Sequence, residues 1–379
     1  MTAGVAEEKG ERPMTLLYSE VEEELRAAVR GLLADRCPPA AVLKRIESEP
    51  YDLDLWRTLA GEIGVAGLLI PEAYGGAGAS ASEAAVVLEE LGRAVAPVPY
   101  FTSAVLATHA LLQSAAVDQA GDLPQAVAVD RVRELLGRLA EGRATAALAV
   151  SFAASPYRPE RGSAVRAGDD GARLSGSVSG VAGADVADVL LVPVNGVLYL
   201  VEGAGVEVVP SLDLTRPVAT VTFDDALAVP LGPVDVAEVL RFGAGLLASE
   251  QLGVAEWCLD TTLAYVKERH QFARPIGSFQ AIKHRLADLW LDVVRARAAA
   301  RGAVAEGSAV SVAVAQAWNG DVAVRIAEEA LQLHGGIGMT WEHPVHLYLK
   351  RAKAAEIALG TPGDHREALA SLAGVPGPE

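Results

Sequence analysis

The chain has 379 residues, of which 51% are hydrophobic and 21% are charged, and this composition excludes extensive disorder. Its net charge of -17 argues against nucleic acid or an anionic membrane surface as the main partner. The only cysteines, Cys37 and Cys258, lie in no metal-ligand spacing, so neither a disulfide framework nor a zinc site is predicted.

The N-terminal residues "MTAGVAEEKGERP" contain no apolar segment of the kind that a signal peptide requires. No stretch of the chain approaches the ~20 consecutive apolar residues that a membrane-spanning helix needs. The sequence therefore predicts a cytoplasmic protein without membrane insertion.

Residues 1–143 are predicted to form an N-terminal helical domain. The segment 19–36 begins with Ser19, a favourable N-cap, and then repeats apolar residues at helical spacing. The segment 81–95, "ASEAAVVLEELGRAV", has the same pattern.

Residues 144–229 differ in composition, because short valine-rich runs such as "ATAALAVSF" and "VATVTFDDA" alternate with Gly, Asp and Asn. This pattern predicts a middle antiparallel β domain. From residue 230 to 379 long alanine-rich helical segments return, and they predict a C-terminal four-helix bundle of a kind that often forms oligomers. The expected fold class is α+β.

Three local sequences, in this order, resemble the acyl-CoA dehydrogenase family over nearly the whole chain. They are "LLIPEAYGGAGASASEAAVVLEELGRAVAPVP" (68–99), "YVKERHQFARPIGSFQAIKHRLADLW" (265–290) and "QLHGGIGMTWEHPVHLYLKRAKA" (332–354). The resemblance implies an FAD-dependent oxidoreductase that oxidises the Cα–Cβ bond of an acyl-CoA thioester and passes electrons to an electron-transfer acceptor. Such chemistry needs a base for the α-proton and a flavin for the β-hydride.

The catalytic base is missing from both positions that the family uses. Ungapped counting places one position at Leu359 and the other at Gly243, and neither residue can accept a proton. Glu250, two helical turns beyond Gly243, and Glu356 are weaker alternatives for a relocated base. We therefore predict no catalytic base in this chain.

The family holds the flavin of its own subunit through an aromatic residue and a hydroxyl residue of the β domain. By resemblance, Gly180 replaces the aromatic residue and Ala182 replaces the hydroxyl residue. The loop that corresponds to the family's flavin-binding loop reads "VSFAASPYRPERGSAV" (150–165). The flavin contacts made within one subunit are thus absent.

The segments that in this family reach the FAD of a neighbouring subunit are retained. An arginine fork can pair two phosphate oxygens, and glycines let backbone N–H groups approach a phosphate closely. The predicted FAD contacts are Arg269, Gln271, Phe272, Gln280, Gln332, Gly335 and Gly336.

Two further groups are interpreted as structural. Asp213, Thr215 and Arg216 resemble a D-x-T-R turn of the family, and an ion-paired turn is the favoured interpretation. The histidines near the glycine segment, at positions 334, 343 and 346, have no second ligand cluster beside them, and no metal site is predicted.

The chain thus lacks the base and the flavin contacts made within one subunit, but it retains the contacts made to a neighbouring subunit. This pattern predicts that the chain is the subunit without a base in a heteromeric α2β2 acyl-CoA dehydrogenase, in which a related subunit has an intact base. Actinobacterial dehydrogenases that act on CoA thioesters of steroid side chains resemble this arrangement. Two alternatives stay open. One is a homo-oligomeric flavoenzyme of natural-product or lipid metabolism with Glu250 or Glu356 as base, and the other is a non-catalytic scaffold.

Overall fold

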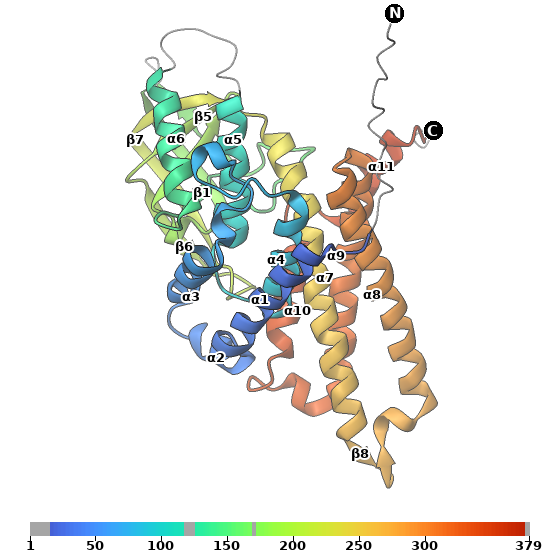
Figure 1. The fold of residues 1–379 in the computed structure, drawn as a ribbon. Coiled ribbons are helices and arrows are strands. Elements are labelled where there is room, and N and C mark those ends of the chain that lie inside the picture. Colours follow the sequence, from blue (N-terminus) through green and yellow to red (C-terminus); the bar gives the residue numbers. More distant parts are fainter. Residues whose placement is uncertain (1–15, 117–125, 169–171, 376–379) are drawn as a thin grey trace, which may run out of the picture.

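The computed structural model describes residues 16–116, 126–168 and 172–375, and Figure 1 shows how their helices and strands are arranged. Helices come first along the chain, a sheet follows, and long helices end it, as the sequence predicts. The N-terminal helices are α1 (Glu20–Arg36), α2 (Pro39–Arg45), α3 (Leu53–Thr58), α4 (Ala81–Arg93), α5 (Thr108–Ala116) and α6 (Ala126–Ala140). Further helical segments are η1 (Leu59–Ile63), η2 (Val65–Gly67), η3 (Glu72–Tyr74) and η4 (Tyr100–Ala107).

Helix α1 begins where the sequence predicts. The Ser19 side chain accepts a hydrogen bond from the Glu22 backbone, and the Glu22 carboxylate accepts one from the Ser19 backbone. This reciprocal capping box satisfies two amides that the helix itself leaves unpaired.

The described sheet has seven strands: β1 (Ala146–Leu148), β2 (Arg166–Ala167), β3 (Arg173–Ala182), β4 (Val189–Val194), β5 (Val197–Val201), β6 (Gly205–Val209) and β7 (Val218–Pro233). The strand order is β1-β4-β5-β7-β3-β2, and β6 also pairs with β7. A short turn, η6 (Ala184–Val186), precedes β4. All pairs are antiparallel except β1 with β4, which are parallel because the long segment containing β2 and β3 intervenes between them.

The C-terminal helices are α7 (Val236–Glu268), α8 (Gln280–Glu306), α9 (Ala309–His334), α10 (Val345–Ile357) and α11 (Pro362–Leu372). A small hairpin of β8 (His270–Gln271) and β9 (Arg274–Pro275), followed by η7 (Ile276–Ser278), joins α7 to α8, and η8 (Gly335–Met339) follows α9. The three long helices pack on one another, α10 is the shorter fourth helix against α7 and α9, and α11 also packs on α9. The division into three domains at 143/144 and 229/230 stays a prediction, although β7 continues to Pro233.

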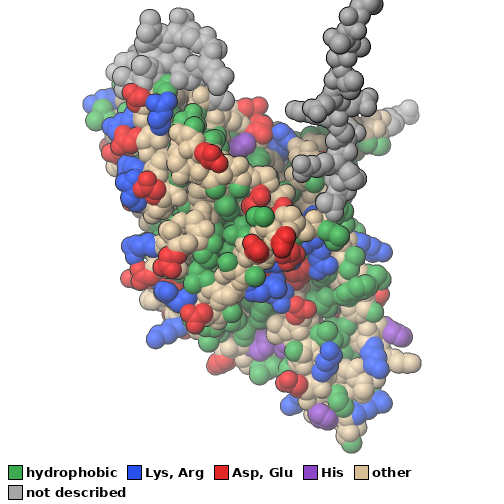
Figure 2. Space-filling view, in the orientation of Figure 1, with side chains coloured by type: hydrophobic (Ala, Val, Ile, Leu, Met, Phe, Trp, Pro, Cys, Tyr) green, Lys and Arg blue, Asp and Glu red, His purple; other side chains and the backbone are tan. Residues whose placement is uncertain are grey.

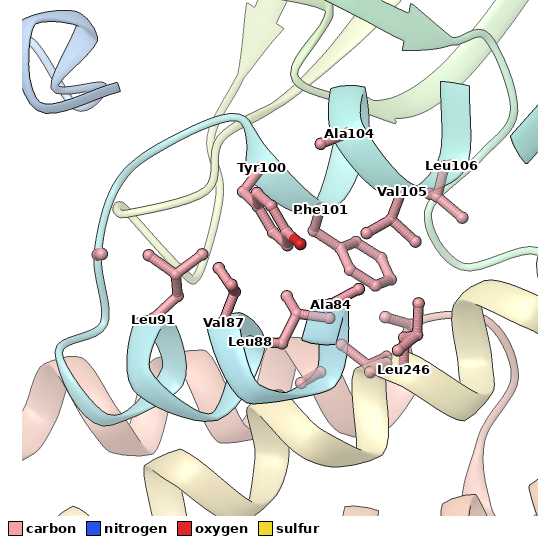
Figure 3. Packing of buried hydrophobic residues seen from close by; sticks show 14 of the residues in the cluster. Ala84, Val87, Leu88, Leu91, Tyr100, Phe101, Ala104, Val105, Leu106 and Leu246 are labelled. Carbon is pink, nitrogen blue, oxygen red and sulfur yellow. The ribbon is translucent and has the colours of Figure 1, made fainter. Parts of the chain in front are cut away.

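One hydrophobic core runs through the N-terminal helices, the C-terminal helices and the inner side of the sheet. Figure 3 shows Tyr100 and Phe101 of η4 packed over Leu88 of α4, with Leu246 of α7 beneath. Helices α4 and α7 touch through their backbones, since a Cβ at Gly253 would lie 1.9 Å from the Glu89 carbonyl oxygen. This contact fixes the position of α7, which carries several of the candidate site residues.

None of the helices formed by the described residues is both long and apolar enough to cross a membrane.

Candidate functional site

The two positions where the family carries a base face the same space, and that space is filled by leucine. Leu359 is completely buried. A Cβ added at Gly243 of α7 would lie 3.1 Å from Leu359 Cδ1 and 2.4 Å from Leu106 Cδ2. Neither position supplies a carboxylate, and a side chain at position 243 would meet Leu106 and Leu359.

Hydrogen bonds hold Leu359 in a backbone conformation that leucine rarely adopts, with φ of 54°. Its N–H donates to the Phe152 carbonyl at 2.9 Å, and its own carbonyl oxygen lies 3.1 Å from His365 Nε2. The other ring nitrogen of His365 lies 3.0 Å from the Tyr157 hydroxyl. Burial lowers the pKa of His365, and a neutral ring that donates from Nε2 and accepts at Nδ1 satisfies both contacts.

This arrangement ties the loop 150–165 to the segment around Leu359. An ion pair between Arg158 and Asp364 adds a second connection between the same two segments. The loop 150–165 is thus held against the segment around Leu359.

Glu250 lies in a buried network of four charged side chains. It forms ion pairs with Arg216 and, at 3.5 Å, with Arg351 of α10. Arg351 also pairs with Asp213, and its Nη2 donates to the Thr215 hydroxyl at 2.6 Å. The interpretation of residues 213–216 as an ion-paired turn is confirmed.

The network holds the Glu250 carboxylate between two guanidinium groups, those of Arg216 and Arg351. Burial alone would raise the pKa of Asp213, but Arg351 and Arg216 hold it below its ordinary value. The second alternative, Glu356, lies on α10 beside Lys353, whose Nζ is 3.2 Å from it.

The strand positions that the sequence predicts to face a flavin within this subunit lie on β3. Gly180 sits at a bulge of β3 with φ of 74°, a conformation that an aromatic side chain would adopt only with strain. Ala182 is buried and pairs with Val218 of β7. Residues 162–164 lie along this strand, where the Ser179 N–H donates to the Gly162 carbonyl at 3.0 Å. Neither Gly180 nor Ala182 offers a ring to stack on a flavin or a hydroxyl to bind it.

The predicted FAD contacts gather at the opposite end of the bundle. Arg269 is the C-cap of α7. Gln271 and Phe272 follow it in the β8–β9 hairpin, and Gln280 begins α8. Phe272 is 88% exposed at a two-residue turn. In Figure 1 this hairpin is the tip farthest from the sheet.

The glycine segment lies at the same end, because Tyr265 of α7 stacks on His334 at 4.6 Å between ring centroids. The Tyr265 hydroxyl also donates to the His334 carbonyl at 3.3 Å. Gly335 and Gly336 are exposed, and no atom lies within 4 Å of where a Cβ would stand on either. An exposed glycine backbone, the N-terminus of α8 and a guanidinium group suit a diphosphate.

The three histidines are packed rather than arranged as ligands. His334 and His343 have ring centroids 4.5 Å apart, and His346 stacks on Trp341. Burial lowers the pKa of all three rings. Within the ranges that the structure describes, no group of three or more potential ligands could hold a metal ion.

Sequence reasoning did not identify Leu106, Phe152 and Arg351 as members of this region. Leu106 lies in an apolar run with no local signal, and Phe152 lies in the loop 150–165, where nothing marks it as a contact of Leu359. Arg351 stands in "YLKRAKA", where it resembles any exposed helical cation. Only the fold brings these three residues together.

Comparison with known proteins agrees with this geometry. Residues 19–127 match the model for the acyl-CoA dehydrogenase N-terminal domain, and residues 233–372 match the model for the acyl-CoA dehydrogenase C-terminal domain. The acyl-CoA dehydrogenase IpdE2 of Mycolicibacterium smegmatis is 38% identical and covers 93% of this chain and 98% of its own length. The Mycobacterium tuberculosis protein of the same name is 36% identical over 93% of this chain and 96% of its own length.

Two solved heteromeric structures are also similar. The ChsE4-ChsE5 complex from Mycobacterium tuberculosis matches with a TM-score of 0.81 and 30% identity, covering 96% of this chain and all of the matched chain. A variant of the Tcur3481-Tcur3483 steroid ACAD matches with a TM-score of 0.79 and 31% identity. The match covers 94% of this chain and 98% of the matched chain. The chain belongs to the acyl-CoA dehydrogenase family, whose enzymes are oxidoreductases acting on CoA thioesters.

The buried network predicts a specific acid sensitivity. Because the folded pKa of Asp213 is depressed, its contribution to stability is fully present above the ordinary Asp pKa of about 3.9 and is lost as the pH falls below that value. Arg351→Met, which leaves two buried carboxylates with one cation, should cost about 3–5 kcal/mol at neutral pH and weaken this acid dependence. Urea unfolding between pH 3 and 7 measures both effects. Arg366→Met, which breaks an exposed pair with Asp321, should cost less than about 1 kcal/mol; equal losses in the two variants would contradict this account.

The filled pocket predicts a coupling between Gly243 and Leu106. Gly243→Ala should lower the free energy of unfolding by about 1–3 kcal/mol, because the added methyl overlaps Leu106 Cδ2. In a Leu106→Ala background, Gly243→Ala should leave the free energy of unfolding almost unchanged. Denaturant titrations of the four proteins give the coupling energy, and Gly31→Ala, at an open helical position of α1, should be neutral or stabilising. Strictly additive costs would show that the two residues do not share the space.

Proposed function

We propose that this chain is the subunit without a base in a heteromeric FAD-dependent acyl-CoA dehydrogenase. A related subunit provides the glutamate and the flavin-facing β domain, and this chain completes that subunit's FAD site from across the interface. The single observation that carries the proposal is the contrast between the two ends of the molecule. Leu359 and Leu106 pack beside Gly243 near the start of α7, whereas every predicted FAD contact is exposed and lies near the other end of that helix.

Each residue of the tip has a distinct part in the proposal. Arg269 pairs with the diphosphate, and the absence of side chains at Gly335 and Gly336 lets the same group approach the backbone closely. Gln271, Gln280 and Gln332 are exposed around it and supply neutral donors and acceptors for the adenosine half. FAD, when bound, supplies the hydride acceptor for the reaction, and this chain's residues hold and orient it.

A bulky substrate is consistent with a complex in which only the related subunit binds substrate. The matched relatives include a chain described as a steroid ACAD, and two of the matched structures contain two different named chains. A subunit that binds no substrate of its own leaves room beside the partner's pocket. We propose that the substrate is the CoA thioester of a steroid side chain or of a similarly large acyl group.

Flavin binding tests the proposal directly. The chain purified alone should be colourless near 450 nm, and it should be yellow when it is co-purified with a related subunit that has an intact glutamate. In the complex, Arg269→Ala should weaken FAD retention about 10- to 100-fold, since a hydrogen-bonded charge contact is worth about 1.5–3 kcal/mol. Arg269→Lys should recover only part of this loss, because lysine lacks the two-pronged fork.

Arg131→Ala serves as the control, because Arg131 is an exposed arginine of α6 far along the chain from the tip. Its complex should retain FAD as the unchanged complex does. A yellow protein from the single chain would contradict the heteromeric proposal. Colourless protein in both preparations would instead favour the scaffold alternative.

A second prediction concerns Glu250. Glu250→Gln in the complex should leave turnover per bound FAD within about twofold, because Glu250 is part of the ion network. Removal of a general base would lower turnover by about 10²–10⁴-fold. Since the network is also structural, the measurement is normalised to bound flavin and is paired with a thermal unfolding curve. Loss of turnover with normal flavin content and normal unfolding would restore Glu250 as the base.

A further inference from the structure

A cleft of about 200 Å³ lies between the sheet and helix α10. Phe152 and Leu212, which stand in connections between strands, line it together with Ile357 of α10. Leu212 is 57% exposed and Ile357 is 51% exposed, so apolar side chains flank the opening. Leu359 is not among the lining residues, and this sheet–α10 cleft is therefore distinct from the space beside Gly243.

One wall of the cleft is formed by a glycine, Gly180 of β3. Its φ of 74° is a conformation that other residues rarely adopt. A Cβ at this position would lie 3.1 Å from the hydroxyl oxygen of Ser151, which lines the same cleft. The glycine therefore keeps this wall free of a side chain.

Among the residues that the structure describes, two polar side chains of the cleft have unused hydrogen-bond donors, although both are more than nine-tenths buried. Ser151 is 8% exposed, and its hydroxyl makes no hydrogen bond within the described ranges. Arg216 is 9% exposed; its Nη2 donates to Glu250, whereas its Nε and Nη1 bond to no described residue. Donors that are largely removed from water and lack a partner are costly, so an oxygen acceptor in the cleft would be stabilised.

The guanidinium group of Arg216 is fixed in place on more than one side. The ring centroids of Phe101 and Phe152 lie 5.5 and 5.4 Å from it, and Glu250 pairs with its Nη2. A donor that is already oriented loses little side-chain freedom when it binds a ligand.

The charges around the cleft favour a neutral ligand over an anion. Two carboxylates and two guanidinium groups balance one another in the buried network, and one of those carboxylates, Asp213, itself lines the cleft. An anionic ligand would therefore face a like charge without a net positive charge to offset it. The chain as a whole has a net charge of -17, and on the face that Figure 2 shows, acidic and basic side chains are interspersed.

The volume of the cleft limits the size of the ligand. An apolar cavity of about 150 Å³ is enough to hold benzene. The sheet–α10 cleft, at about 200 Å³, has room for one ring with a short substituent.

We infer that the sheet–α10 cleft binds a small, neutral, apolar molecule with a carbonyl or similar oxygen at one end. The oxygen accepts hydrogen bonds from the free donors of Arg216 and Ser151, and the apolar body packs against Phe152, Leu212 and Ile357. The inference does not rest on the proposed function, because this chain alone forms the cleft and the tip of the bundle takes no part in it.

Three probes that share one ring test the chemistry of the site on the full-length chain, in whatever assembly it purifies. Acetophenone carries a neutral carbonyl, ethylbenzene carries no acceptor and benzoate carries a negative charge. Calorimetric titration should show acetophenone binding at least about 10-fold more tightly than the other two, because a hydrogen bond to a charged donor contributes that much. Equal affinities for acetophenone and ethylbenzene, or tighter binding of benzoate, would overturn the inference.

A substitution in the lining locates the site. Ala354 is half-buried on α10 and lines the cleft, so Ala354→Leu should fill it and weaken acetophenone binding at least about 10-fold. Ala317→Leu is the matched control, since Ala317 is half-buried on α9 and does not line the cleft. A thermal unfolding curve of each variant checks that it is folded. Unchanged binding in folded Ala354→Leu would place the probe elsewhere and overturn the assignment.

Riboflavin distinguishes a small ligand from a flavin ring. Its three fused rings exceed the single ring for which the cleft has room, so riboflavin should not displace acetophenone in a competition titration. Displacement that is lost in Ala354→Leu would assign the cleft to a flavin ring and overturn the inference.

Discussion

The buried ion network of Asp213, Arg351, Glu250 and Arg216 is the interaction on which the arrangement of the molecule depends. It joins the turn before β7 to α7 and α10, so it fixes the sheet against the bundle at their shared core. Arg216 is further held between the rings of Phe101 and Phe152, at 5.5 and 5.4 Å from their centroids. Removing one charge would leave the others buried without compensation, so the network is retained as a unit.

The same network is connected to the packing around Leu359. Phe152, which packs on Arg216, accepts a hydrogen bond from the backbone of Leu359, and Leu359 in turn fills the space beside Gly243. One series of contacts therefore runs from Arg216 through Phe152 to Leu359. The tip of the bundle takes no part in it. Under the proposed function, changes in this core would leave the tip of the bundle unaffected.

Several features could be predicted from the sequence because they are local. The cap at Ser19, the valine-rich strands and the long helices follow from patterns within a few residues of each other, and the family follows from motifs of fixed spacing. The ion-paired turn at residues 213–216 was also predicted, although its partner Arg351 was not. That pairing joins residues 138 positions apart, and nothing in the sequence near Arg351 distinguishes a buried arginine from an exposed one.

Other features depend on packing and had no sequence signal. The parallel pairing of β1 with β4 is set by the path of the chain across the sheet. The fact that Leu359 and Gly243 face one space follows only from the contact between α7 and the segment after α10. Sequence counting gave both positions as lacking a base, and the structure adds that leucine occupies the space between them.

The stoichiometry of FAD in the purified heteromer tests the central claim most directly. If this chain only completes a neighbour's site, the complex holds one FAD for every two chains, equal to the number of subunits with an intact glutamate. Quantitative flavin release compared with total protein gives this ratio. One FAD per chain would show that this subunit forms a flavin site of its own and would contradict the account.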